Sequence, residues 1–164
     1  MRAVTTSVKK RVAIVVAVLA IGVGASACFP DITPGALPSD PLKAEVIQRM
    51  NYDRVIRGVP QMHYSPKLEN LAGTWAWSMA SLYGFGHQDL GAVLRSPDFA
   101  GWYTLGENIL VGPGSMSSYD MEIAWMNSPG HRANILNGNF NAVGVGYWRA
   151  PDGRLWVAVN FGGI

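Results

Sequence analysis

The sequence predicts an α+β domain, with helices in its first half and a β-hairpin at its C-terminus. Apolar residues recur at three- and four-residue steps through two segments before residue 85, which is the spacing of an amphipathic helix. Residues 143–161 instead alternate between two faces on either side of a Pro-Asp-Gly turn, which is typical of a hairpin. Strands and helices do not alternate regularly along the chain, so a parallel α/β sheet is disfavoured.

Residues 1–27 are predicted to be a secretory signal peptide. The segment opens with four basic residues and no acid, continues with a twelve-residue apolar run from 12 to 23, and ends in small residues before Cys28. The apolar run is short for a permanent membrane span, which makes an uncleaved N-terminal anchor the weaker alternative. An extracytoplasmic location follows from this prediction.

Cys28 is the only cysteine of the chain, and it lies where cleavage is expected. Residues 25–27 form an A-x-A site, and cleavage there would release a secreted protein. The same residues followed by Cys28 resemble a bacterial lipobox, in which lipidation of the cysteine anchors a cell-surface lipoprotein to the membrane. We favour lipidation because the single cysteine stands at this position. One cysteine also excludes an intrachain disulfide.

Removal of the leader changes the charge of the protein. The whole chain has a net charge of +2, whereas the part after residue 27 keeps nine basic and eleven acidic residues and has a net charge of −2. No run of Lys and Arg remains, so a nucleic-acid partner is not expected. Residues 28–40 carry three prolines and are predicted to be a tether, and residues 41–164 have the size of one domain, expected to be a monomer.

Two helices are expected before residue 85, and both start with the same signal. Asp40-Pro41 and Ser65-Pro66 each place an N-cap side chain before a proline that suits the first helical position. Gly58 can close the first helix, and the second continues to Gly84. The second helix has an apolar stripe that is expected to pack in the core, formed by Trp75, Met79 and Leu82.

The second half of the domain is expected to alternate loops with short elements. Residues 84–98 are rich in glycine and are predicted to be a loop, and residues 102–111 form an extended segment broken at Gly106. Ser117 and Asp120 make a capping box for a helix through Trp125. Ser128-Pro129 starts a last helix, which Asn137-Gly138 ends before the hairpin.

Three side chains are candidates for chemistry: His87, Glu107 and His131. Each follows a glycine near the junction of a loop and an element, so the three could meet in a cleft. Two imidazoles and a carboxylate can hold a divalent metal such as zinc, or they can act as general acid and base. A helix N-terminus would favour the neutral form of His131. Their spacing contains no short zinc motif, so the pattern alone also allows purely structural roles.

Residues 124–136 read AWMNSPGHRANIL and residues 140–147 read FNAVGVGY, which together resemble the signature of bacterial CAP-domain proteins. These belong to the superfamily of cysteine-rich secretory proteins, antigen 5 and plant pathogenesis-related proteins. The similarity extends over residues 42–161 and includes Gly106-Glu107-Asn108-Ile109 and His87 with Asp89-Leu90. It implies a three-layer α-β-α sandwich with a mostly antiparallel central sheet. It also implies a cleft of two histidines and two acidic residues, which binds a divalent cation in some members.

Three of the four cleft positions are matched in this chain by His87, Glu107 and His131. The fourth is a glutamate in animal and plant members, and Ser128 stands there instead. Glu122 lies nearly one helical turn before Trp125 and is expected to be solvated. His63 matches a position outside the cleft. The tryptophans are expected to be packing residues, although Trp102 or Trp148 could contact a ligand from the rim of the cleft.

Two functions remain open from the sequence. The favoured one is a binding module whose cleft takes a lipid, a sterol or a peptide-like ligand, with a divalent metal, zinc above others, as a possible cofactor. The alternative is a hydrolase in which His87, Glu107 and His131 activate water directly or through zinc. No nucleophile supports the hydrolase, because Cys28 lies at the processing site and Ser128 is explained as a helix cap. A third interpretation is an envelope protein that acts through its lipid anchor, with a vestigial groove.

Overall fold

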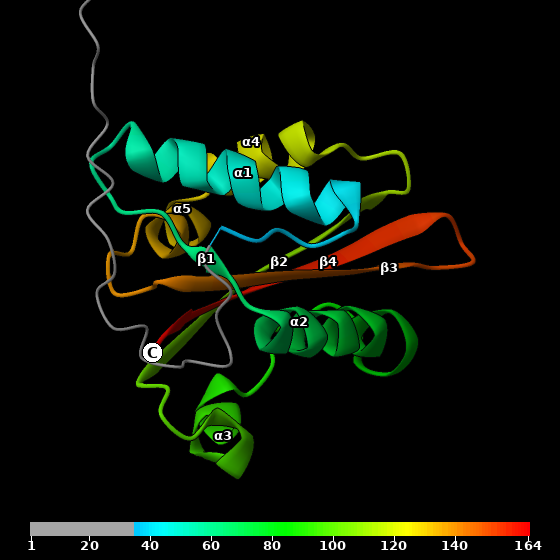
Figure 1. Cartoon of the computed structure of the whole chain (residues 1–164). Helices are drawn as coiled ribbons and strands as arrows, with labels where there is room; N and C mark the ends of the chain where they lie inside the picture. Colours follow the sequence, from blue (N-terminus) through cyan, green and yellow to red (C-terminus); the bar gives the residue numbers. More distant parts are fainter. Residues whose placement is uncertain (1–34) are drawn as a thin grey trace, which may run out of the picture.

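The fold is a sheet with helices on both faces. The computed structural model describes residues 35–164, so the predicted signal peptide, Cys28 and most of the predicted tether lie outside the described residues. Helices α1 (Pro41–Val55), α4 (Ser118–Met126) and α5 (Pro129–Ile135) lie on one side, and α2 (Pro66–Ser78) and α3 (Leu90–Arg95) on the other (Figure 1). This arrangement confirms the predicted three-layer α+β architecture. None of the helices formed by residues 35–164 combines the length and hydropathy needed to span a bilayer.

The sheet has four strands in the order β1-β3-β4-β2. They are β1 (His63–Tyr64), β2 (Thr104–Pro113), β3 (Ala142–Arg149) and β4 (Arg154–Gly163). The short β1 pairs in parallel with β3, whereas β3–β4 and β2–β4 are antiparallel. The predicted hairpin is therefore confirmed as β3–β4, and β2 is an edge strand whose Glu107 lies opposite Asn160 of β4.

Strand β2 runs unbroken through Gly106, so the predicted break at this residue is wrong. A Cβ atom at position 106 would lie 2.5 Å from Cζ of Phe140, closer than real Cβ contacts allow. The glycine therefore makes room for an aromatic ring and leaves the strand geometry intact.

The four predicted helix starts are confirmed, three of them with side-chain caps. The Asp40 side chain accepts a hydrogen bond from the Lys43 backbone, and Ser65 accepts one from Leu68, both at 3.2 Å. Ser117 and Asp120 form the expected capping box at the start of α4. Ser128 occupies the N-cap position of α5, but its side chain makes no capping hydrogen bond within residues 35–164.

The segment between residues 84 and 98 is not only a loop. Asp89 caps the short helix α3 by accepting a hydrogen bond from the Ala92 backbone at 2.8 Å, and a 3₁₀ turn, η2 (Pro97–Phe99), follows. The helix was not predicted because its six residues offer too little apolar periodicity.

The end of the second predicted helix also differs from its periodic pattern. After α2 the chain forms one π-helical segment, η1 (Met79–Tyr83), in which the Gly84 N–H bonds to the carbonyl of Met79 five residues before it. This wider turn rotates later side chains away from the core face. Met79 is buried and Trp75 half-buried as expected, but Leu82 is 61% exposed and does not belong to the core.

Helix α2 lies directly on β3 because two strand residues have no side chain. A Cβ atom at Gly146 would lie 2.0 Å from the backbone nitrogen of Gly73, and one at Gly144 would lie 2.1 Å from that of Glu69. Only glycine permits this approach of helix and strand. The contact fixes α2, and with it the chain that leaves α2 toward His87.

Arg54 of α1 is a fully buried cation that ties α1 to the end of α5. The residue is 0% exposed, and its guanidinium donates hydrogen bonds to four carbonyl groups at 2.7–2.9 Å. The acceptors are Pro60, Ile135, Asn137 and Phe140. Two of them lie at and just after the C-terminus of α5, where the helix leaves carbonyl groups without internal partners.

Candidate functional site

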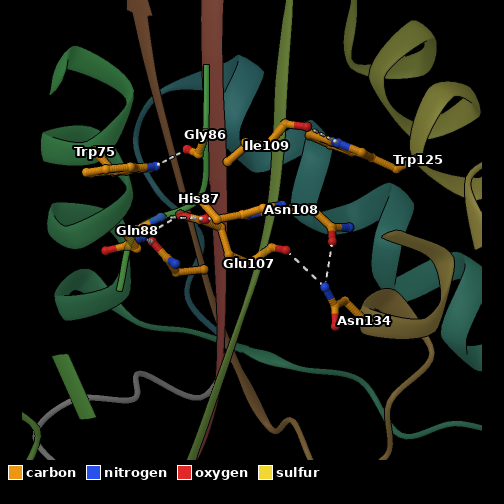
Figure 2. Close-up of polar contacts among 10 residues, drawn as sticks. Trp75, Gly86, His87, Gln88, Glu107, Asn108, Ile109, Trp125 and Asn134 are labelled. Atoms are coloured by element: carbon orange, nitrogen blue, oxygen red, sulfur yellow. Dashed lines mark hydrogen bonds and ion pairs between the residues drawn. The ribbon is translucent and has the colours of Figure 1, made fainter. Parts of the chain in front are cut away.

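His87 and Glu107 are in direct contact at the edge of the sheet. Nδ1 of His87 lies 2.7 Å from Oε1 of Glu107 (Figure 2). The Glu107 side chain is only 1% exposed, whereas that of His87 is 57% exposed. A buried carboxylate on a strand therefore orients an imidazole that solvent can reach, and it leaves Nε2 of the ring on the side away from Glu107.

Gln88 occupies the second oxygen of the same carboxylate. Its Nε2 donates to Oε2 of Glu107 at 2.5 Å and to Oδ1 of Asn160 at 3.2 Å, and its backbone N–H reaches Oε1 of Glu107 at 3.3 Å. Both oxygens of Glu107 are thus hydrogen-bonded. Gln88 was not among the predicted site residues, and its position beside His87 was the only signal that could have identified it.

The loop that carries His87 is held on the end of α2. Nε1 of Trp75 donates to the carbonyl of Gly86 at 3.0 Å (Figure 2). The Trp75 ring also stacks on Tyr83, with 6.0 Å between the ring centroids. Trp75 is therefore a packing residue, as expected, and it also positions the residue before His87.

His131 approaches from the opposite layer, on α5. Its carbonyl accepts a hydrogen bond from Nδ2 of Asn108 at 3.0 Å. Nδ2 of Asn134 donates to the Glu107 carbonyl and to Oδ1 of Asn108, both at 2.9 Å (Figure 2). Two amide side chains therefore fasten α5 to the strand that carries Glu107.

The two imidazoles lie close enough to interact electrostatically. Burial lowers the pKa of His131 from its usual value, and the charge of His87 lowers it further. The direction matches the expected neutral form of His131, but burial is its largest cause rather than the helix dipole that the sequence suggested.

The outer edge of β2 is covered by side chains of α4 and α5. Nε1 of Trp125 donates to the carbonyl of Ile109 at 3.3 Å, two residues along the strand from the Glu107 carbonyl that Asn134 caps (Figure 2). Carbonyls two residues apart on an antiparallel strand point to the same edge. The edge that faces away from β4 is therefore satisfied here by helix side chains instead of a further strand.

The donor types at this site suit zinc, but the side chains do not form an assembled metal site. Within residues 35–164, no three His, Cys, Asp or Glu side chains are close enough to hold one ion. Glu107 is bonded to His87 and Gln88 instead. The arrangement is a carboxylate–imidazole pair with a second, more buried imidazole nearby, which can bind polar groups or exchange a proton.

The other candidate residues lie elsewhere. Glu122 is buried, with 6% exposure, so the expectation that it is solvated is wrong; it faces α1 rather than His87. His63 is exposed on β1, outside the site, as expected. Trp102 is 6% exposed and packs on Phe99, whereas Trp148 is 41% exposed on β3.

Comparisons with known proteins agree with this architecture. Residues 47–161 match the sequence profile of the cysteine-rich secretory protein family, CAP. The chain is 33% identical over 116 residues to the uncharacterized protein YkwD of Bacillus subtilis (strain 168), covering 68% of this chain and 44% of that protein. The chain thus spans less than half the length of this curated relative.

Solved structures share the fold at low sequence identity. An extracellular protein containing a SCP domain from Bacillus anthracis str. Ames has a TM-score of 0.63 and 23% identity, covering 79% of this chain and 45% of that one. A cysteine-rich secretory protein from Staphylococcus aureus subsp. aureus Mu50 also has a TM-score of 0.63, with 19% identity and coverage of 77% and 40%.

Proposed function

The chain belongs to the CAP, or cysteine-rich secretory protein, family, and we propose that it is an exported domain that binds a small ligand at the site of His87, Glu107 and His131. The observation that carries the proposal is the contact between exposed His87 and buried Glu107. Acidic side chains are seldom this deeply buried unless they are paired, and the partner here is an imidazole that solvent can reach.

A peptide-like ligand fits this site better than a lipid or a sterol. The side chains that meet there are imidazole, carboxylate and amide groups, which recognise polar atoms. A lipid or sterol needs an apolar cavity. Two pockets lie on other faces of the described chain, one between α1 and α4 and one beside α5.

Binding can be tested by titrating the protein with short acetylated peptides and measuring the NMR chemical shifts of the two histidines. Peptides that bind here should shift the signals of His87 and His131, and Glu107→Gln should weaken binding at least tenfold because the imidazole loses its anionic partner. Glu45→Gln, which removes a carboxylate of α1, serves as the control and should bind normally. Equal binding by Glu107→Gln and the wild type would refute the site.

A hydrolase is the second candidate, and one observation favours it. A carboxylate 2.7 Å from Nδ1 of His87 is what a general base needs to hold its ring while Nε2 takes a proton from water. Turnover of peptide or ester substrates that disappears in both His87→Ala and Glu107→Gln would establish catalysis. Turnover that survives Glu107→Gln would exclude this mechanism.

Zinc is a separate proposal for the same side chains. Two imidazoles and one carboxylate would hold the ion, which would supply Lewis acidity there. Because Glu107 is already bonded to Gln88, the proposal requires a direct measurement of metal content. The zinc proposal would be supported if the purified protein holds zinc in a fixed ratio and if His87→Ala and His131→Ala each remove the zinc. Unchanged zinc content in both variants would refute the zinc proposal.

Export and lipidation rest on residues 1–28. Lipidation predicts that the wild type partitions with membranes and that Cys28→Ala moves the protein to the medium. If the wild type is already found in the medium, the A-x-A cleavage applies instead.

A further inference from the structure

A second site lies between α1 and α4, apart from His87 and Glu107. It is a pocket of about 340 Å³. Its lining residues on α1 recur at three- and four-residue steps from Glu45 to Asp53, and those on α4 are Tyr119, Glu122 and Ile123. Each set therefore lies on one face of its helix, and the two faces form the walls of the pocket.

Glu122 differs from the other two acids of this pocket because no cationic or hydroxyl side chain of the described chain bonds to its carboxyl group. It is 6% exposed, and within residues 35–164 neither of its carboxyl oxygens has a hydrogen-bond donor. Asp53 forms an ion pair with Arg57. Glu45 accepts a hydrogen bond from the Ser118 hydroxyl at 2.8 Å, and that hydroxyl accepts one from Nε of Arg49 at 3.0 Å.

Protonation explains how Glu122 remains buried. Burial first, and the neighbouring Asp53 carboxyl second, raise the pKa of Glu122 to about 8, against the opposing charges of Arg49 and Arg57. At neutral pH the carboxyl group is therefore largely protonated. A ligand that brings a positive charge would displace that proton and supply the missing counter-ion.

We propose that the pocket between α1 and α4 binds an organic ammonium group, with Glu122 as its counter-ion. With Glu122 protonated, the lining carries two carboxylates and one arginine, and loss of its proton adds a third carboxylate, so a bound cation is favoured over an anion. A metal ion is disfavoured, because no three acidic or histidine side chains of residues 35–164 come together to ligate it.

The rim of the pocket suits an ammonium on a short apolar chain. Tyr52 and Tyr119 are 66% and 56% exposed and line the pocket with Ile123, which is 44% exposed. The Tyr119 ring already accepts the Arg49 guanidinium 5.3 Å from its centroid, which shows that an aromatic face here can hold a cation. The aromatic and aliphatic surfaces would contact the carbon chain of the ligand.

Titration calorimetry of the mature protein with n-hexylammonium tests the proposal, with hexanol and hexanoate as probes of equal length. Hexylammonium should bind at least tenfold more tightly than either. Its affinity should rise between pH 6.5 and 8.5, because Glu122 must lose its proton, and binding should release a proton that buffers of different ionisation enthalpy detect. Hexanoate binding as tight as that of hexylammonium, or binding without proton release, would overturn the proposal.

Matched variants locate the effect. Glu122→Gln preserves the shape of the side chain and should lose at least tenfold in affinity, whereas Asp152→Asn, in the β3–β4 turn, removes the same charge outside the pocket and should bind normally. Unchanged affinity in Glu122→Gln would overturn the proposal. His87→Ala should also bind hexylammonium normally, which separates this pocket from the proposed ligand site.

A second ligand identifies the natural source of the ammonium group. Binding of Nα-acetyl-lysine amide with similar affinity would indicate a lysine side chain, whereas binding of hexylammonium alone would indicate a free alkylamine. Absence of binding by both would overturn the proposal.

Discussion

Replacing Arg54 should destabilise the domain far more than replacing an arginine at its surface. Arg54→Met keeps an unbranched apolar chain but removes a fully buried guanidinium that donates to four carbonyl groups. A hydrogen bond to a charged group contributes about 1.5–3 kcal/mol, and carbonyls left without a donor carry a further desolvation cost. Water entering the gap and methionine packing offset part of this loss. We therefore expect the free energy of unfolding to fall by about 3–5 kcal/mol.

Urea unfolding followed by circular dichroism measures the effect, and Arg57→Met is the matched control. Arg57 lies three residues further along, is exposed, and pairs with Asp53 at the surface, so its loss should cost less than about 1 kcal/mol. Arg54→Lys should fall between the two, because one ammonium cannot reach four acceptors. A loss in Arg54→Met no larger than in Arg57→Met would show that the four carbonyls do not depend on this side chain.

Three further changes test other parts of the structure by urea unfolding. Gly146→Ala places a Cβ atom 2.0 Å from the Gly73 backbone and should lower stability by about 3 kcal/mol, whereas Gly73→Ala, with open space around its Cβ position, should raise it by about 0.5–1 kcal/mol. Asn134→Ala removes the donor to the Glu107 carbonyl and should lower stability by about 1–3 kcal/mol. The same change should weaken ligand binding, and normal binding would mean that other contacts hold α5 in place. Burial and Asp53 raise the pKa of Glu122 to about 8, against about 4.3 in the unfolded chain, so the stability that protonated Glu122 contributes should be lost as pH rises from 4.5 to 8. Across that range the stability difference should move in favour of Glu122→Gln by about 2–4 kcal/mol, and a constant difference would contradict the raised pKa.

Much of the fold could be predicted because its signals are local. Asp40-Pro41 and Ser65-Pro66 specify helix starts through bonds within a few residues, and the capping box at Ser117 does the same. The prediction that failed at Gly106 depended on a distant partner. The role of Gly106 is decided by the Phe140 ring, which lies 34 residues away in the chain.

The site was predictable only through residue type and resemblance. His87, Glu107 and His131 stood out as titratable side chains, but Gln88 has no such signal and gains its role by bonding to Glu107 across the loop–strand contact. The burial of Glu122 was not predicted. The sequence shows that Glu122 lies on a helix, but it does not show which face of α4 packs on α1. Burial of a carboxylate depends on that packing, and no local pattern encodes it.

The sequence motif on α5 determines how this helix is held against the sheet more directly than it determines the chemistry of the site. Asn134 bonds to β2, Ile135 is 0% exposed, and the carbonyl of His131 accepts from Asn108, so these groups hold the helix in place. Of these residues, only His131 also brings an imidazole toward His87. The partner of the second Glu107 oxygen is Gln88, which lies outside the motif. The bond between Gln88 and Glu107 decides whether the second Glu107 oxygen is available to a ligand. Gln88→Ala should therefore change ligand affinity while leaving the fold intact, as expected of a residue that sets specificity.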